Sequence, residues 1–218
     1  MSWVRMAVIL VITAFLTRFI PFSAFFANVN TLVHELAHAL VALLLQGSVM
    51  HIYLFADQSG VTYTAFSEGW MSIPIALAGY IGASLFAAAL FMLFARDRER
   101  LGLGIIATAA LLALALFVRN GYGMAWCAGF AVLTLFICVL APNWLRRAYY
   151  LLLAFICLVE SVISSFVLLY LSVTSPSAAG DAAGLSESTF IPAFLWALLF
   201  TIFSLWCAKM ALGHLFKR

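Results

Sequence analysis

Charged residues are scarce in this chain of 218 residues. Only 9% of the residues are Asp, Glu, Lys or Arg, whereas 67% are hydrophobic, and the mean hydropathy is +1.15. Soluble globular domains have about a quarter charged residues and about half apolar residues. The composition therefore excludes a soluble domain and predicts a polytopic α-helical membrane protein.

Basic charge and cysteine are limited as well. The net charge is only +3 and comes mostly from clusters beside apolar segments, so it indicates membrane orientation and we expect no nucleic-acid partner. The four cysteines all lie within apolar stretches, and none has CxxC spacing. This distribution is typical of small core residues and argues against a disulfide framework or a cysteine metal knuckle.

Apolar segments recur along the chain and are separated by short polar turns. We expect an all-α polytopic membrane protein of about six to seven transmembrane helices, forming a single integral-membrane domain over residues 1–218. No internal repeat or soluble domain is visible. Besides a shorter helix near residues 31–45, the predicted spans are 3–26, 71–95, 101–118, 124–141, 145–173 and 191–212.

The first apolar segment, residues 3–26, allows a second interpretation. Pro21 interrupts it, and small residues follow at Ser23 and Ala24. A signal peptide has a similar order of features, with an apolar core before a small-residue cleavage site. The apolar stretch is long for a signal peptide, so a retained span is the leading prediction.

The most informative stretch is His34-Glu-Leu-Ala-His38 within the apolar segment 31–45. Residues four apart share one face of a helix, so His34 and His38 can direct two imidazoles at one divalent metal, usually zinc. Glu35 lies one position further along, where its carboxylate can activate a water molecule at that metal. Ionisable residues in an apolar segment cost about 2.5–3.5 kcal/mol each, so three within five residues indicate function. The alternative is that these histidines are only hydrogen-bonded core residues.

The helix that carries this motif has expected boundaries of its own. Asn28 and Asn30 offer N-cap side chains before it, and Gly47 is a typical residue for its end. Such a helix has about 16 residues and a length of about 24 Å, which is marginal for a full membrane crossing. We therefore expect neighbouring helices to shelter it.

Residues 48–66 differ in character from the segments around them. β-Branched and aromatic residues flank Asp57-Gln-Ser-Gly60, which is typical of a turn, so we expect a β-hairpin. A hairpin cannot face lipid with open edges and must lie at the interface or against protein. Its edge could bind an extended substrate peptide as an added strand. The alternative is a plain surface loop.

The positions of basic residues predict the orientation in the membrane. Residues 96–100, 146–147 and 217–218 are basic clusters that fit on the cytoplasmic side with one crossing per span. Residues 46–70 and 174–190 then share the opposite side, and neither segment contains Lys or Arg.

A catalytic zinc usually has three protein ligands, so an acidic residue must join the two histidines. Glu160 is the only acidic residue deep within another predicted span. Helix rise places it about 20 Å below the non-basic surface, against about 18 Å for His34 and about 12 Å for His38. Glu160 could instead be a neutral, hydrogen-bonded residue.

Asp181 is the second candidate for the third ligand. It lies in the polar stretch 174–190, which we expect to be a loop on the same side as the hairpin. From there it would have to dip by about 10 Å or more to reach the metal. Its alternative role is an exposed loop or helix-cap residue.

Several motifs together resemble the bacterial branch of the site-2-protease-like intramembrane zinc metallopeptidases, the peptidase M50B-like branch. The resemblance extends from residue 31 to about residue 200, and the histidine motif is its most specific part. The matching stretches are His34-Glu-Leu-Ala-His-Ala-Leu40, Gly60-Val-Thr62, Ala78-Gly-Tyr-Ile-Gly-Ala-Ser84, Val118-Arg-Asn120 with Gly123, and Asp181-Ala-Ala-Gly-Leu185 before Ile191-Pro192 and Trp196.

The resemblance implies a zinc protease that cuts membrane-embedded peptides, with His34 and His38 as ligands and Glu35 as the base. Better-known members take the third ligand from an Asn-Pro…Asp-Gly motif, which residues 119–123 (Arg-Asn-Gly-Tyr-Gly) do not contain. The choice between Glu160 and Asp181 therefore stays open. The family also implies an integral membrane protein, which we expect in a bacterial inner membrane.

The leading hypothesis is an intramembrane zinc metalloprotease whose partners are the lipid bilayer and a transmembrane or membrane-proximal peptide substrate. A non-catalytic pseudoprotease or membrane scaffold is the first alternative. A small transporter with a buried His and Glu relay is the second, although a relay does not require the spacing of His34, Glu35 and His38.

Overall fold

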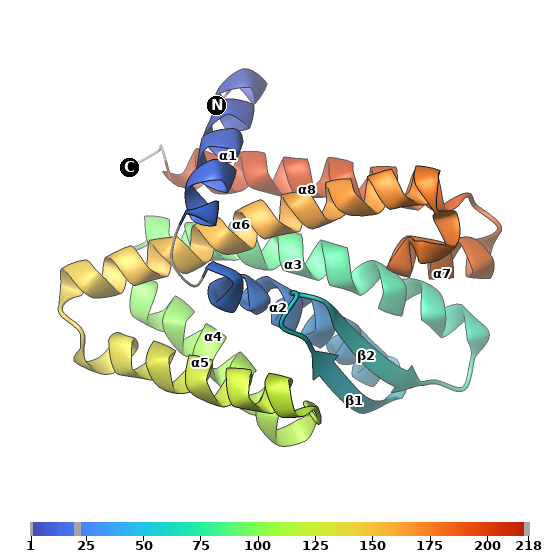
Figure 1. Cartoon of the computed structure of the whole chain (residues 1–218), viewed down its shortest axis with the longest axis horizontal. Helices are drawn as coiled ribbons and strands as arrows, with labels where there is room; N and C mark the ends of the chain where they lie inside the picture. The colour runs from blue at the N-terminus through green and yellow to red at the C-terminus, as the bar shows by residue number, and fades with distance from the viewer. Residues whose placement is uncertain (1, 20–22, 216–218) are drawn as a thin grey trace.

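The computed structural model describes residues 2–19 and 23–215. These residues form eight α-helices, two short 3-10 helices and one two-stranded sheet (Figure 1). In chain order the elements are α1 (Trp3–Arg18), α2 (Ser23–Leu44), β1 (Ser48–Leu54), β2 (Gly60–Ala65), η1 (Gly69–Met71), α3 (Ser72–Ala95), α4 (Glu99–Leu116), α5 (Gly121–Leu140), α6 (Asn143–Thr174), η2 (Pro176–Ala178), α7 (Gly180–Thr189) and α8 (Ala193–Leu215).

Five of the described helices are long and apolar enough to cross a membrane: α3 together with η1, and α4, α5, α6 and α8. Helix α1 is apolar but shorter, and α2 carries the histidine motif. The chain is therefore an all-α polytopic membrane protein with one small β-hairpin, as the sequence predicts. The predicted boundaries of the five long helices agree with the observed ones within three residues.

The start of the chain differs from the prediction. The segment 3–26 is not one helix, because α1 ends at Arg18 and α2 begins at Ser23. Pro21 lies outside the described residues. Helix α2 has 22 residues rather than about 16, since it begins before the predicted N-cap residues.

Asn28 and Asn30 are thus interior residues of α2 rather than N-caps, and both are buried. Asn28 donates a hydrogen bond from its Nδ2 to the Tyr122 hydroxyl at 2.7 Å. Tertiary contacts of this kind override the weak intrinsic preference of asparagine for helix ends.

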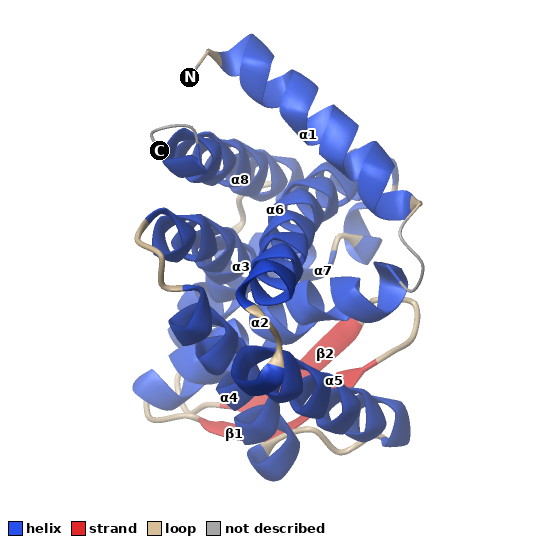
Figure 2. Cartoon of the chain, turned by 90° about the vertical axis from the view of Figure 1, so that its left-hand side faces the viewer, coloured by secondary structure: helices blue, strands red, loops and turns tan. Residues whose placement is uncertain are grey.

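The long helices α3, α6 and α8 lie side by side and form the centre of the molecule (Figure 1). Helix α2 packs against α3, and α4 and α5 form an antiparallel pair that contacts α6. Helix α1 lies on the outside of the bundle, where it contacts α6 and α8 (Figure 2). The α3–α4 turn, the α5–α6 turn and the C-terminal end of α8 share one end of the bundle in Figure 1, which agrees with the prediction for the clusters 96–100 and 146–147; residues 217–218 lie outside the described residues.

The predicted hairpin is present and packs against α2. Strands β1 and β2 pair antiparallel, and the turn contains Asp57, whose carboxylate accepts hydrogen bonds from the backbone N–H and hydroxyl of Ser59. The inner face of the hairpin is apolar, with Ile52 and Leu54 fully buried. Burial of this face explains why the hairpin lies against protein rather than lipid.

The segment between α4 and α5 protects the other edge of β1. Ile52 donates its N–H to the Phe117 carbonyl and accepts a hydrogen bond from the N–H of Arg119. The Asn120 side chain then binds both backbone groups of Leu54, accepting from its N–H at 3.1 Å and donating to its carbonyl at 2.5 Å. Asn120 thereby continues the sheet and attaches the hairpin to the α4–α5 turn.

Candidate metal centre

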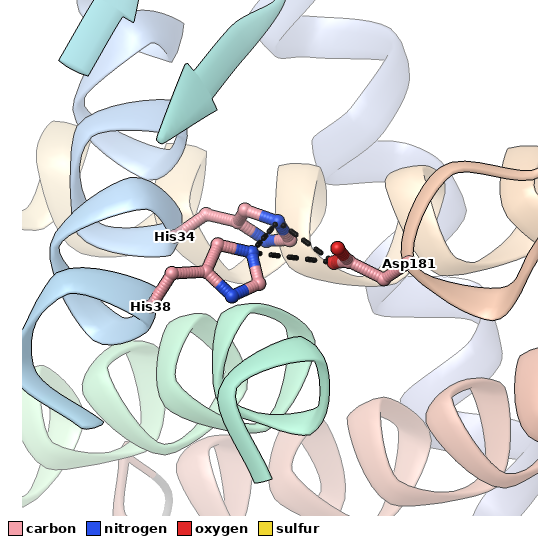
Figure 3. A group of neighbouring side chains, drawn as sticks. All are labelled: His34, His38 and Asp181. Carbon is pink, nitrogen blue, oxygen red and sulfur yellow. Dashed lines mark hydrogen bonds and ion pairs between the residues drawn. The ribbon is translucent and has the colours of Figure 1, made fainter. Parts of the chain in front are cut away.

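Helix α2 directs both motif histidines to one point. Their Nε2 atoms are 3.0 Å apart, because residues four apart lie on the same face of the helix (Figure 3). The rings are nearly perpendicular, and His38 is the more buried of the two. The predicted convergence of two imidazoles is therefore the geometry that the chain adopts.

Asp181 completes a group of three. Its Oδ2 atom is 3.2 Å from Nε2 of His34 and 3.3 Å from Nε2 of His38 (Figure 3). Burial alone would raise the pKa of the Asp181 carboxyl, but its interactions with the two histidines hold that pKa well below the usual range. The carboxyl group is therefore ionised at neutral pH, as a metal ligand must be.

The donor set fits a divalent metal. Ligand atoms at about 2.0–2.1 Å from a tetrahedral zinc lie about 3.3 Å from one another, close to the three separations observed here. The Oδ2 atom of Asp181 is buried and has no hydrogen-bond donor with suitable geometry among the described residues. A buried oxygen without a donor is well explained by a ligand that belongs at that point.

The segment that carries Asp181 is not the predicted loop. Residues 176–189 form η2 and α7, and α7 packs against α3, α6 and α8. Ala182 and Leu185 are fully buried in this contact. The expectation that Asp181 must dip from an outer loop is therefore wrong, because α7 folds back into the bundle and brings the carboxylate with it.

Glu160, the other predicted candidate, lies on α6 and is not a member of the group formed by His34, His38 and Asp181. Similar depth along the membrane normal, on which its prediction rested, is not sufficient to bring its carboxylate into this group. The structure thus brings together three of the four predicted ligand residues.

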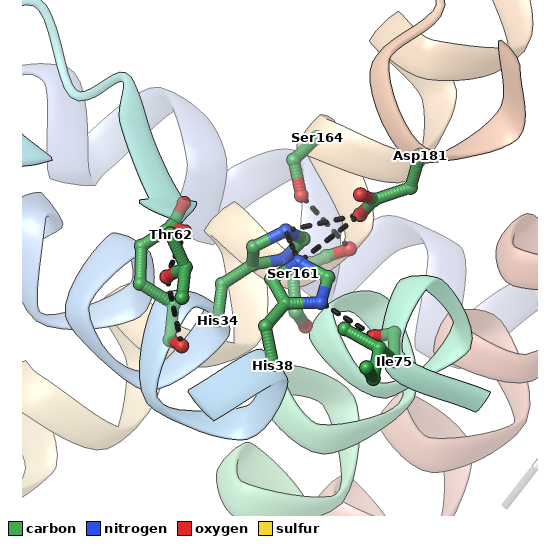
Figure 4. Close-up of polar contacts among 8 residues, drawn as sticks. His34, His38, Thr62, Ile75, Ser161, Ser164 and Asp181 are labelled. Carbon is green, nitrogen blue, oxygen red and sulfur yellow. Dashed lines mark hydrogen bonds and ion pairs between the residues drawn. The ribbon is translucent and has the colours of Figure 1, made fainter. Parts of the chain in front are cut away.

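Helix α3 supports the histidines from the opposite side. The carbonyl of Ile75 is 2.6 Å from Nδ1 of His38, so this ring donates there and presents the lone pair of Nε2 to the centre (Figure 4). Gly79 lies next to both rings. A Cβ atom at this position would be 2.5 Å from Nε2 of His34 and from Nε2 of His38. The space for an ion between the rings therefore exists because residue 79 is a glycine, which has no side chain.

Glu35 faces the same centre and is held by the hairpin. The residue is 4% exposed, and its Oε2 atom accepts a hydrogen bond of 2.7 Å from the Thr62 hydroxyl. A cavity of about 400 Å³ connects these groups; its lining includes the three ligand residues, Glu35 and the β2 residues Gly60 to Thr62. The carboxylate therefore has both a fixed orientation and room for water and substrate.

Sequence reasoning missed Ile75, and it named Thr62 and Asn120 only within stretches that resemble the family, without predicting their supporting roles. Each acts through a backbone or hydroxyl contact with a residue distant in the chain, and no local pattern marks such a contact. Gly79 belongs to the stretch from Ala78 to Ser84, which stands out in the sequence only for its resemblance to the family, and the position of the histidine rings gives it a role at the site.

A two-histidine, one-carboxylate centre beside a glutamate, within a bundle of membrane-length helices, is the arrangement of a membrane metallopeptidase. The comparison with protein families agrees. A model of the Peptidase M50B-like family matches residues 5–211, and the chain belongs to this family. Neither the curated proteins nor the solved structures gave a significant match.

Proposed function

We propose that the protein is an intramembrane zinc metalloprotease that hydrolyses peptide bonds of membrane-embedded substrates. The observation that carries this proposal is the convergence of His34, His38 and Asp181 with Glu35 on one cavity. These are a metal-ligand set and a base within the same space. A bacterial inner membrane is the location that the proposal implies.

His34, His38 and Asp181 would hold the zinc ion, and Ile75 orients one of the imidazoles. When bound, zinc lowers the pKa of water from 15.7 to about 7 and polarises a carbonyl group. Glu35 accepts the proton of the attacking water and later delivers it to the leaving amide nitrogen. The Thr62 hydroxyl keeps the Glu35 carboxylate in place during both transfers.

Strand β2 offers an edge on which an extended substrate can lie. Ile52 directs its backbone groups away from β2, so Ile52 and Thr62 form a non-hydrogen-bonded pair, and the Thr62 N–H and C=O point away from β1. No described strand pairs with this outer edge. A substrate segment added there would pass along the cavity lined by Glu35 and the metal ligands.

The test uses the full chain purified in detergent, with zinc content and cleavage of transmembrane peptides as readouts. The Glu35→Gln variant should keep one zinc per chain and lose cleavage by at least about 10²-fold, as expected for loss of general-base catalysis. Retained cleavage by this variant would refute the role of Glu35. Zinc binding without any turnover by the wild type would instead indicate a pseudoprotease.

A further inference from the structure

Tyr80 on α3 lines the same cavity as the metal ligands and Glu35. Its ring is nearly perpendicular to the His34 imidazole, with ring centres 4.8 Å apart. The Tyr80 ring also stacks on Phe200 of α8, with ring centres 4.9 Å apart. Two aromatic neighbours from different helices therefore define the position of this ring next to the centre.

The hydroxyl of Tyr80 differs from those of two buried tyrosines in its hydrogen bonding. Two buried tyrosines elsewhere in the bundle bind protein partners: Tyr150 donates to the Leu90 carbonyl, and Tyr149 is 2.9 Å from the Thr134 hydroxyl. Within the described residues the Tyr80 hydroxyl makes no hydrogen bond. A phenol is a strong neutral donor, and one left free in a site with two carboxylates and two imidazoles calls for a ligand.

We propose that Tyr80 is a catalytic residue that donates a hydrogen bond to the carbonyl oxygen of the scissile peptide bond. The inference rests on the proposed protease function and extends it. Hydrolysis places negative charge on that oxygen, and a preorganised donor in a poorly hydrated site stabilises the charge as it develops. Glu35 is held by the hairpin and Tyr80 by α8, so base and donor reach the cavity from different elements.

The step is an addition followed by an elimination. The water oxygen forms a bond to the carbonyl carbon while Glu35 takes a water proton, and the C=O electron pair moves to the carbonyl oxygen. Tyr80 keeps its proton and shares it in a hydrogen bond with that oxygen. The C–N bond then breaks as Glu35 returns the proton to nitrogen, which leaves a carboxylic acid and an amine.

The variant Tyr80→Phe retains the ring and both aromatic contacts and removes only the hydroxyl. We expect unchanged zinc content, a KM within about twofold and a kcat lowered by about 10²–10³-fold, the usual effect of losing one such donor. The matched control is Tyr149→Phe, which removes a buried tyrosine hydroxyl on α6 that is bonded to Thr134. A kcat for Tyr80→Phe close to that of this control would overturn the proposal.

A second measurement separates this proposal from the protease function itself. Transmembrane peptides with one phosphinate at successive positions imitate the charged tetrahedral state and bind without being cleaved. The tightest of them should bind zinc-loaded Tyr80→Phe at least about tenfold more weakly than the wild type. Equal binding would overturn the role of Tyr80, and so would a zinc-loaded wild type that binds none of these peptides. Weaker binding with no wild-type turnover would support Tyr80 while contradicting the proposed function.

Discussion

Three side chains from two distant segments form the candidate metal centre, and among the described residues Asp181 is the only acidic member of this group. His34 and His38 come from α2, and Asp181 comes from the first turn of α7. The assignment of the third ligand therefore depends on the carboxylate of Asp181 alone, and single substitutions can test it.

The Asp181→Ala variant should lose most of its zinc, because two imidazoles alone rarely hold the ion in competition with a chelator. Glu160→Ala is the matched change on α6 and should keep wild-type zinc content. Elemental analysis of both purified variants gives the comparison. Zinc retained by Asp181→Ala and lost by Glu160→Ala would reverse the assignment.

Gly79 gives a second prediction at this scale. In Gly79→Ala the new Cβ would lie 2.5 Å from both Nε2 atoms, so the rings must move and zinc content should fall. Gly104 on α4 is the matched control, since a Cβ there meets nothing within 4 Å. Gly104→Ala should keep its zinc and gain up to about 1 kcal/mol of helix stability. Normal zinc loading in Gly79→Ala would show that the rings have room to retreat.

Two short elements, α7 and the β-hairpin, complete the site that the long helices α2 and α3 begin. Helix α7 is buried through Ala182 and Leu185, and the hairpin is attached at both strands. Strand β2 holds Glu35 through Thr62, and β1 is tied to the α4–α5 turn by Asn120. The hairpin is thus a bridge between α2 and the α4–α5 pair.

Replacement of Asn120 should loosen this bridge without removing a metal ligand. Asn120→Ala leaves the N–H and C=O of Leu54 without partners, which costs about 1–3 kcal/mol for each buried group. We expect normal zinc content, a lower melting temperature and a peptide cleavage rate reduced more than by Ser59→Ala, which affects only the hairpin turn. Equal activities of the two variants would mean that the hairpin edge does not position substrate.

At the scale of the whole molecule, different interactions stabilise the two ends of the bundle. We call the end with the α3–α4 and α5–α6 turns the basic end; the candidate metal centre lies toward the other end, where Figure 1 shows α7. At the basic end, Arg147 on α6 lies 3.3 Å from both Asp97 and Glu99 and so joins the two turns. At the other end, the contacts of His34 and His38 with Asp181 join α2 to α7. A bound ion would therefore link elements that are far apart in the chain.

Removal of the metal should consequently lower the stability of the folded protein. A ligand present at 100 times its Kd stabilises the state that binds it by about 2.7 kcal/mol. The melting temperature of the wild type in detergent should therefore fall on treatment with a chelator and recover with added zinc. Asp181→Ala serves as the control, and its melting temperature should not respond to either addition. A wild-type protein that is equally indifferent would contradict a link through the ion.

Much of this protein follows from local sequence. Long apolar runs set the five spanning helices, since a bilayer requires about twenty apolar residues and internal backbone hydrogen bonds. The turn at Asp57 to Gly60 sets the hairpin, and the spacing of His34 and His38 places two rings on one helical face.

Tertiary structure decided which carboxylate meets those rings. Asp181 arrives because Ala182 and Leu185 are buried against other helices, and burial of small apolar groups in a short, weakly amphipathic segment leaves little trace in the sequence. Tertiary structure likewise decided the positions of Thr62, Gly79 and Tyr80 at the site, because their neighbours there come from other parts of the chain. The hydrophobic periodicity of a sequence predicts the secondary structure of a single segment. A site made of several segments forms only when those segments pack together, and the periodicity of each segment does not specify that packing.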